Sequence, residues 1–229
     1  MPPKQTRAAP KKPHDVLAID IGGTRIKFRT QAQLEPVKFD SGPTMTPQRM
    51  LETIKELTHG WKYDRVAIGF PGPVANNAPL REPWNLGSGW KNFPFDQAFN
   101  RKPVRMINDA AMQALGGYDG GDMLFLGLGT GLGSAMVLDK IVHGMELAHM
   151  PWKKGKSYED YLGAAGLAKS GRKAWTKNVF EVVEILREGL LGDYVVLGGG
   201  NAKLLKDLPA HTRMGSNKDA FIGGFRLWG

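Results

Sequence analysis

Residues 122–139 read DMLFLGLGTGLGSAMVLD, and this stretch sets the architecture of the chain. Apolar runs flank a turn with four glycines at alternate positions from Gly127 to Gly133, which predicts a strand, a tight turn and a second strand. A dinucleotide-binding turn leads into a helix, whereas the apolar strand SAMVLD follows here. A P-loop contains Gly-Lys-Ser/Thr, which this turn lacks, so both motifs are excluded. The expected site is a turn whose backbone N–H groups converge on an anion such as phosphate, with the Thr130 hydroxyl beside them.

A second glycine turn of the same form lies in IDIGGTRIK, residues 19–27, where Asp20 ends the predicted strand. A carboxylate beside a phosphate repels it unless a cation lies between them, and Mg²⁺, usually held through water, suits both groups. Either glycine run alone is better explained as a tight hairpin. The two turns together, with a further LGGG at residues 197–200, favour phosphate binding.

The order of the patterns predicts two α/β lobes, residues 14–108 and residues 109–216. A closing helix at residues 217–229 is expected to join the first lobe, and residues 1–13 are expected to form a disordered basic arm. The best-marked helix is TPQRMLETIKELTHG, residues 46–60, which has a threonine N-cap and a proline at the first helical position. Besides the glycine hairpin, strands are predicted at residues 15–22, 25–30, 35–40, 65–70, 104–109 and 194–200. Further helices are predicted at residues 109–118 and within residues 157–191. A long loop, typical of functional or disordered segments, is predicted at residues 71–103.

The chain of 229 residues carries a net charge of +9 and has no cysteine, which excludes disulfides and thiolate zinc sites and fits a cytoplasmic protein. Four basic residues and no acid lie in residues 1–13, and seven basic residues against two acids lie in residues 151–177. These segments are either solvated surface or a field that attracts a polyanion. No membrane span or secretory signal is expected, and no nucleic-acid-binding module accompanies the charge, so nucleic acid is not an expected partner.

Six short motifs then carry a resemblance to a known family. They are AIDIGGTRIK, GFPGPV, IND, GLGTGLGSA, ELAH and VVLGGGN, in this order between Ala18 and Asn201. The order resembles that of the ROK sugar kinases, within the actin-like ATPase superfamily. The short chain and the ELAHMP form look most like the polyphosphate glucokinase and glucokinase branch. The resemblance implies a two-lobed, actin-like ATPase fold in which two RNase H-like α/β lobes flank a cleft.

The resemblance also implies roles for particular residues. Asp109, in IND, matches the family's catalytic base and contacts the sugar. The other implied sugar-binding residues are Asn85, Asn108, Glu146, His149 and Glu159. The implied phosphate-binding residues are Asp20, which would hold Mg²⁺ through water, Gly22, Gly23, Thr24, Gly129, Thr130 and Gly131. The segment implied to pack on adenosine is Gly198, Gly199, Gly200 and Asn201.

Elementary chemistry agrees with Asp109 as a base. A carboxylate at a strand end and a helix start lies where α/β sheets expose catalytic groups, and it can accept a hydroxyl proton as a bond to phosphorus forms. The same position also suits a helix N-cap. Without the resemblance, a surface pair is the favoured interpretation of Glu146 and His149. Because the chain has no cysteine, His149 is not expected to bind zinc.

The expected function is therefore a Mg²⁺-dependent kinase that phosphorylates the 6-hydroxyl of a hexose, with glucose as the first candidate. Its donor is either ATP, which suits LGGGN, or polyphosphate, which suits the basic residues at 151–177. The alternative is a sugar-binding sensor or degenerate ROK protein without catalysis. Residues 1–13 are too short for the helix-turn-helix of the family's repressors, and since dimers are common in the family, a homodimer is the implied assembly.

Overall fold

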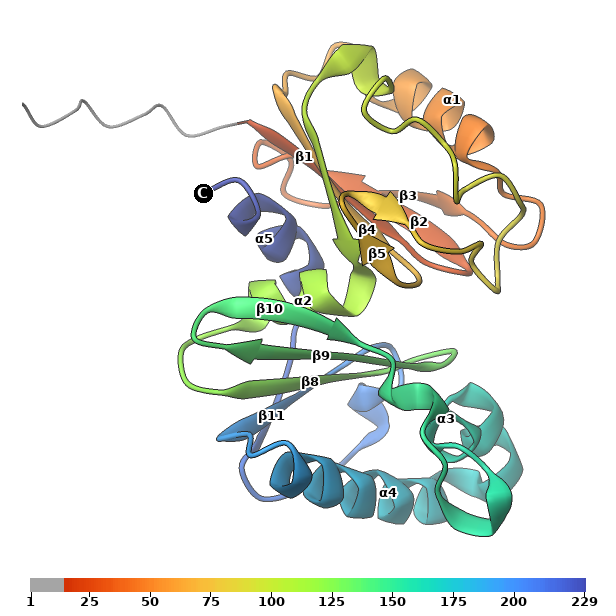
Figure 1. The fold of residues 1–229 in the computed structure, drawn as a ribbon, viewed down its shortest axis with the longest axis vertical. Helices are drawn as coiled ribbons and strands as arrows, with labels where there is room; N and C mark the ends of the chain where they lie inside the picture. Colours follow the sequence, from red (N-terminus) through yellow and green to blue (C-terminus); the bar gives the residue numbers. More distant parts are fainter. Residues whose placement is uncertain (1–14) are drawn as a thin grey trace, which may run out of the picture.

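The computed structural model describes residues 15–229, so the predicted arm at residues 1–13 lies outside the described residues. Two five-stranded sheets form its framework (Figure 1). The strands of the first sheet are β1 (Val16–Ile21), β2 (Arg25–Arg29), β3 (Val37–Asp40), β4 (Arg65–Phe70) and β7 (Val104–Asn108). The strands of the second sheet are β8 (Met123–Leu128), β9 (Leu132–Leu138), β10 (Ile141–Met145), β11 (Tyr194–Gly198) and β12 (Thr212–Met214).

Both sheets have the same topology. The first sheet has the order β3-β2-β1-β4-β7 and the second the order β10-β9-β8-β11-β12. In each sheet, the first three strands in chain order form an antiparallel meander, and the last two join it in parallel. Each sheet is therefore opened by one of the two glycine hairpins that the sequence predicts.

Five α-helices accompany the sheets in the described part of the chain. They are α1 (Pro47–Leu57), α2 (Asp109–Gly117), α3 (Tyr158–Leu162), α4 (Ala164–Gly189) and α5 (Asp219–Arg226). As predicted, the Thr46 side chain caps α1 and Pro47 begins it. None of the helices within residues 15–229 combines the length and the apolar character needed to cross a bilayer.

The predicted α/β class is confirmed, and three smaller elements were missed. Strands β10 and β12 were not predicted, and the predicted loop at residues 71–103 contains a small hairpin of β5 (Val74–Ala75) and β6 (Ala78–Pro79). The turn before β10 uses Asp139 and Lys140 with positive φ angles, although glycine or asparagine is the usual signal for such a turn. The lobe boundaries drawn at residues 108/109 and 216/217 stay predictions.

Helices α2 and α5 lie side by side between the two sheets (Figure 1). Their backbones touch because both helices contain glycine at the crossing: a Cβ atom on Gly116 would overlap the carbonyl oxygen of Asp219, and one on Gly223 would overlap that of Met112. On the far side of α5, a Cβ on Gly224 would lie 2.7 Å from the Ala18 Cβ of β1. Helix α5 therefore packs closely against α2 on one side and against the first sheet on the other.

The opposite face of α2 packs on the second sheet. Three alanines of the helix share an apolar cluster with β8, β9 and β11, and the cluster consists of Ala110, Ala111, Ala114, Met123, Phe125, Ala135, Val137 and Val196. Small residues on the helix let it lie close to the strands. Helix α2 is thus fixed to both halves of the molecule.

The end of the chain is fastened to the first sheet as well. The Trp228 ring lies 5.5 Å from the Arg65 guanidinium and 4.3 Å from that of Arg105. Its indole N–H donates to the Val66 carbonyl at 3.1 Å. These contacts hold α5 in the orientation that the crossing with α2 requires.

The crossing generates a stability prediction. Replacing Gly223 with alanine adds a methyl group where there is no room, and such overpacking typically costs about 1–3 kcal/mol. We expect Gly223→Ala to lower the free energy of unfolding by at least this amount in urea titrations. Gly189→Ala is the matched control, because a Cβ there has no described neighbour within 4 Å. Equal stabilities of the two variants would contradict the close packing.

Candidate active site

A cavity of about 730 Å³ opens where strands from both sheets end. Its walls come from the segments that follow the carboxyl ends of β1, β4, β7, β8 and β11, the usual place for sites in α/β proteins. The predicted site residues that line it are Gly22, Gly23, Asn85, Asn108, Asp109, Gly129, Thr130, Gly131, Glu146, His149, Glu159 and Gly199. The predicted site residues that lie outside the lining are Asp20, Thr24, Gly198, Gly200 and Asn201.

Asp109 is the first residue of α2 and faces this cavity. Burial raises the pKa of its carboxyl group to about 7, with further contributions from the charges of Asp20 and Glu146. Its Oδ1 atom accepts one hydrogen bond, from the Ala110 N–H at 2.8 Å. A carboxylate that titrates near neutrality inside a cavity has the properties of a general base.

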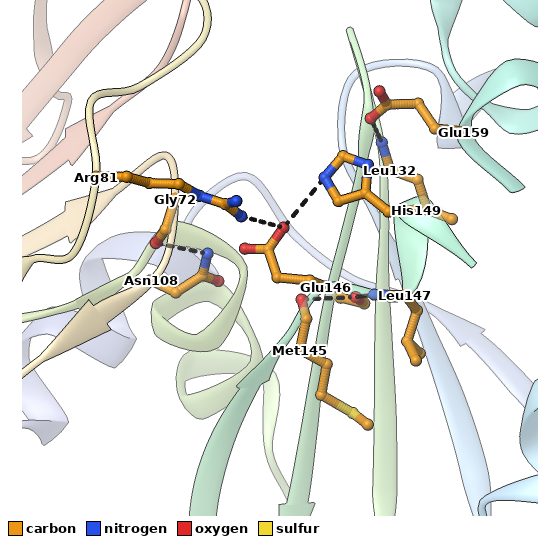
Figure 2. Close-up of polar contacts among 10 residues, drawn as sticks. Gly72, Arg81, Asn108, Leu132, Met145, Glu146, Leu147, His149 and Glu159 are labelled. Carbon is orange, nitrogen blue, oxygen red and sulfur yellow. Dashed lines mark hydrogen bonds and ion pairs between the residues drawn. The ribbon is translucent and has the colours of Figure 1, made fainter. Parts of the chain in front are cut away.

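Asn108, and not Asp109, caps helix α2. Its Oδ1 atom accepts from the Ala111 N–H at 3.0 Å, and its Nδ2 atom donates to the Gly72 carbonyl at 3.2 Å (Figure 2). The alternative that Asp109 is only an N-cap therefore does not apply, and its carboxylate is left for chemistry. Contact between Asn108 and a sugar stays a prediction.

Glu146 joins residues from both halves of the molecule. Its Oε2 atom lies 3.5 Å from Nε2 of His149 and 3.6 Å from Nη2 of Arg81, which reaches it from the opposite wall (Figure 2). All three side chains are exposed and line the cavity, and a role of Glu146 and His149 in sugar binding stays a prediction. Sequence reasoning missed Arg81. The one available signal was its place in the long loop at residues 71–103, which was predicted to be functional.

Two contacts hold the segment that carries Arg81. The carboxylate of the next residue, Glu82, accepts from the N–H groups of Trp90 at 3.0 Å and Lys91 at 3.3 Å. Trp90 is fully buried in the core of the first half, and its indole N–H donates to the Met45 carbonyl at 3.2 Å. The backbone that carries Arg81 is therefore anchored to the core of the first half of the molecule.

The glycine loop, residues 129–132, has every one of its first three carbonyl groups bound to protein. The Gly129 carbonyl accepts from Nδ2 of Asn201 at 3.1 Å, and the Thr130 carbonyl accepts from the N–H of Ala164 at 3.1 Å. The Gly131 carbonyl accepts from the Gly129 N–H at 3.1 Å. Within residues 15–229, no protein group accepts from the N–H of Thr130 or Gly131. Two backbone donors of the loop are thus available to a ligand in the cavity.

Glu159 rests against this loop. Its Oε2 atom accepts from the Leu132 N–H at 3.1 Å, and a Cβ on Gly131 would overlap the same oxygen (Figure 2). The carboxylate therefore connects α3 to the glycine loop. Whether it also binds a sugar hydroxyl, as the resemblance implies, stays a prediction.

The first glycine turn lies across the cavity. The Gly22 N–H donates to the Arg25 carbonyl at 3.0 Å, and a Cβ on Gly23 would lie 2.8 Å from the Asn85 Cβ, so the turn packs directly on Asn85. Asp20, at the end of β1, is buried and lies 3.6 Å from the Lys27 ammonium. Burial raises the pKa of Asp20, and the charge of Lys27 opposes that rise.

The residues fit a magnesium ion that is held mainly by the phosphates of a bound substrate and by water. In the described part of the chain, no three His, Asp or Glu side chains are grouped as metal ligands. Mg²⁺ usually keeps several waters and binds through one or two carboxylates and the substrate's phosphates, a pattern that requires no larger cluster. Asp20 lies outside the cavity lining, so its contact with Mg²⁺ through water stays a prediction.

Comparisons with known proteins agree with the motifs. The sequence model described as the ROK family matches residues 16–153. The bifunctional enzyme NanE/NanK of Brucella melitensis biotype 1 is 31% identical over 152 residues, and the match covers 58% of this chain and 28% of that protein. The chain thus spans little more than a quarter of the length of the curated relatives it matches.

Solved structures extend the likeness to the whole fold. The inorganic polyphosphate/ATP-glucomannokinase of Arthrobacter sp. strain KM is 22% identical with a TM-score of 0.78, covering 93% of this chain and 98% of that one. The ROK family glucokinase of Streptomyces griseus, solved with glucose and AMPPNP, is 17% identical with a TM-score of 0.72. The match covers 93% of this chain and 99% of that one. At these identities the likeness concerns the fold alone, and it confirms the predicted actin-like ATPase class.

The pKa of Asp109 predicts a pH-dependent stability. Folding raises that pKa from 3.8 to about 7, so protonation of Asp109 favours the folded state. This contribution to the free energy of unfolding is complete below about pH 4 and is lost as the pH rises through about 7. Relative to the wild type, Asp109→Asn should therefore gain on the order of 4 kcal/mol of unfolding free energy between about pH 4 and about pH 8. The control is Asp119→Asn, an exposed carboxylate beyond the far end of α2. Equal pH dependences for the two variants would contradict the raised pKa.

Proposed function

The chain belongs to the ROK family, and we propose that it is a kinase that transfers a phosphoryl group from polyphosphate or ATP to the 6-hydroxyl of a hexose, with glucose as the first candidate. One observation carries the proposal. A carboxylate with a pKa of about 7, Asp109, shares a cavity with a glycine loop that offers two unused backbone N–H donors. A base for a hydroxyl and a cradle for phosphate are the two parts that phosphoryl transfer needs.

In the proposed reaction, Asp109 accepts the proton of the sugar hydroxyl while that oxygen forms a bond to the transferred phosphorus. The bond between this phosphorus and the bridging oxygen of the donor breaks, and the remaining donor leaves with one phosphate fewer. A pKa near the working pH keeps a useful fraction of Asp109 ionised and still gives it affinity for the proton. The buried position of the carboxyl group supplies that pKa.

The acceptor side of the cavity offers hydrogen-bonding groups for the sugar. We assign sugar contacts to Asn85, Asn108, Glu146, His149 and Glu159, in agreement with the resemblance. Arg81 supports this side of the cavity because its guanidinium lies beside the carboxylate of Glu146. The Arg81 guanidinium on one side and the His149 ring on the other limit the positions of that carboxylate, so it can meet a hydroxyl in one orientation.

The donor side consists of the two glycine turns. The N–H groups of Thr130 and Gly131 are the assigned donors to phosphate oxygens, and the turn at Gly22 and Gly23 closes the opposite wall. Mg²⁺, when bound, neutralises charge on the donor's phosphates, with Asp20 as its protein contact through water.

The charge near the glycine loop favours polyphosphate as a donor beside ATP. Helix α4 begins against the loop, since the Ala164 N–H donates to the Thr130 carbonyl. Lys169 is exposed and lies five residues further, about 8 Å along the helix. Exposed Arg172 and Lys173 follow a kink of the helix at Gly171. A polyanion longer than a triphosphate could continue from the loop along these cations. The name of the Arthrobacter relative, a polyphosphate/ATP-glucomannokinase, supports the use of both donors. Assembly as a homodimer stays a prediction of the resemblance.

The test is a coupled assay of glucose 6-phosphate formation from D-glucose and MgCl₂, with ATP and with polyphosphate in turn. We expect turnover with polyphosphate and with ATP. Asp109→Asn should lower kcat by about 10²- to 10⁴-fold, the usual contribution of a general base, while calorimetry still detects glucose binding.

Asp119→Asn is the matched control and should retain the wild-type rate, because this exposed residue lies beyond the other end of the same helix. Absence of turnover with both donors on glucose and mannose would refute the kinase. Glucose binding without any turnover would instead favour a sugar-binding protein without catalysis.

A further inference from the structure

We propose that Asn201 is a positioning residue that holds the glycine loop in its phosphate-binding conformation, whichever phosphoryl donor is used. The resemblance implies that the segment 198–201 packs on adenosine. In the structure, Asn201 instead donates from Nδ2 to the Gly129 carbonyl at 3.1 Å, and from its backbone N–H to the Leu128 carbonyl at 2.9 Å. Both contacts lie at the point where β8 passes into the glycine loop.

The segment reaches the loop because its first two residues are glycines. Gly199 has a φ of +82°, which disfavours other residues, and a Cβ there would overlap the Leu128 carbonyl oxygen. A Cβ on Gly198 would lie 2.6 Å from the Phe125 ring. Gly200, in contrast, would have open space around a Cβ. The glycines at 198 and 199 thus serve a close approach between protein segments, which needs no nucleotide.

Peptide geometry gives this approach a consequence for phosphate binding. In a trans peptide the carbonyl of one residue and the N–H of the next lie in one plane and point in opposite directions. When Asn201 holds the Gly129 carbonyl, it also fixes the direction of the Thr130 N–H. The Ala164 N–H fixes the Gly131 N–H in the same way, through the Thr130 carbonyl. The contacts from Asn201 and Ala164 therefore fix the directions of the Thr130 and Gly131 N–H groups. These are the two N–H groups of the glycine loop without a protein acceptor.

The loop needs such a constraint because glycine permits several backbone conformations. With no side chain at Gly129, the peptide between Gly129 and Thr130 can rotate at little steric cost, and a Cβ on Gly129 would meet no described atom within 4 Å. A rotated peptide would turn a carbonyl oxygen toward the phosphate and repel it. The hydrogen bond from Asn201 opposes that rotation.

The first test needs no substrate and measures amide hydrogen exchange by NMR. In Asn201→Leu, which keeps the bulk of the side chain without its donor, the bonded amides of Gly129 and Leu132 should exchange up to about tenfold faster, as expected for loss of one hydrogen bond. Asn201→Ala is the second variant, should leucine prevent folding. Lys203→Ala, exposed on the following turn, is the matched control. Unchanged exchange in the Asn201 variants would overturn the proposal.

The second test rests on the proposed function. The Asn201 variants should lower kcat by about tenfold with polyphosphate and with ATP alike, because both donors place a phosphate on the loop, and the KM for glucose should stay unchanged. A rise confined to the KM for ATP would overturn the proposal and restore the adenosine contact. If the wild type transfers no phosphoryl group, the proposed function fails, and the exchange measurement still decides the role of Asn201.

Discussion

The contact between helices α2 and α5 is the constraint on which the rest of the structure depends. Gly116 and Gly223 let the two backbones touch, α5 lies on the first sheet, and α2 lies on the second. Asp109 is the first residue of α2, so the same contact sets its distance from both sheets. A side chain positioned by a rigid helix needs little support from its own contacts, and the Asp109 side chain accepts a hydrogen bond from the N–H of its neighbour Ala110.

The site relies on backbone groups more than on cationic side chains. Among the cavity-lining residues of the described chain, lysine and arginine are represented by Arg81 alone. The acidic residues of the lining are Glu82, Asp109, Glu146 and Glu159. In the proposed reaction, binding of an anionic donor would therefore depend on oriented N–H groups, on Mg²⁺ and on the cations of α4 outside the cavity. This balance explains why the orientation of peptide planes in the glycine loop matters so much to the proposed chemistry.

The parts of the fold that follow from local pattern could be predicted from the sequence. The two glycine hairpins, helix α1 and the position of Asp109 at a strand end all depend on neighbouring residues. Strand β12 has three residues and forms only when β11 pairs with it, so no local signal identifies it. The contacts of Arg81 with Glu146 and of Asn201 with Gly129 were also missed. Gly129 and Asn201 are 72 positions apart, and only the folded chain brings them together.

In the proposed mechanism Asp109 acts as a base whose pKa is raised by burial and by neighbouring carboxylates. The most direct measurement is the pH dependence of kcat/KM for glucose, which reports the ionisation of the free enzyme. With such a base, we expect kcat/KM to fall tenfold per pH unit below about pH 7 and to level off above it. A profile that stays level down to about pH 5 would contradict it, because a base with an ordinary aspartate pKa would remain ionised over that range.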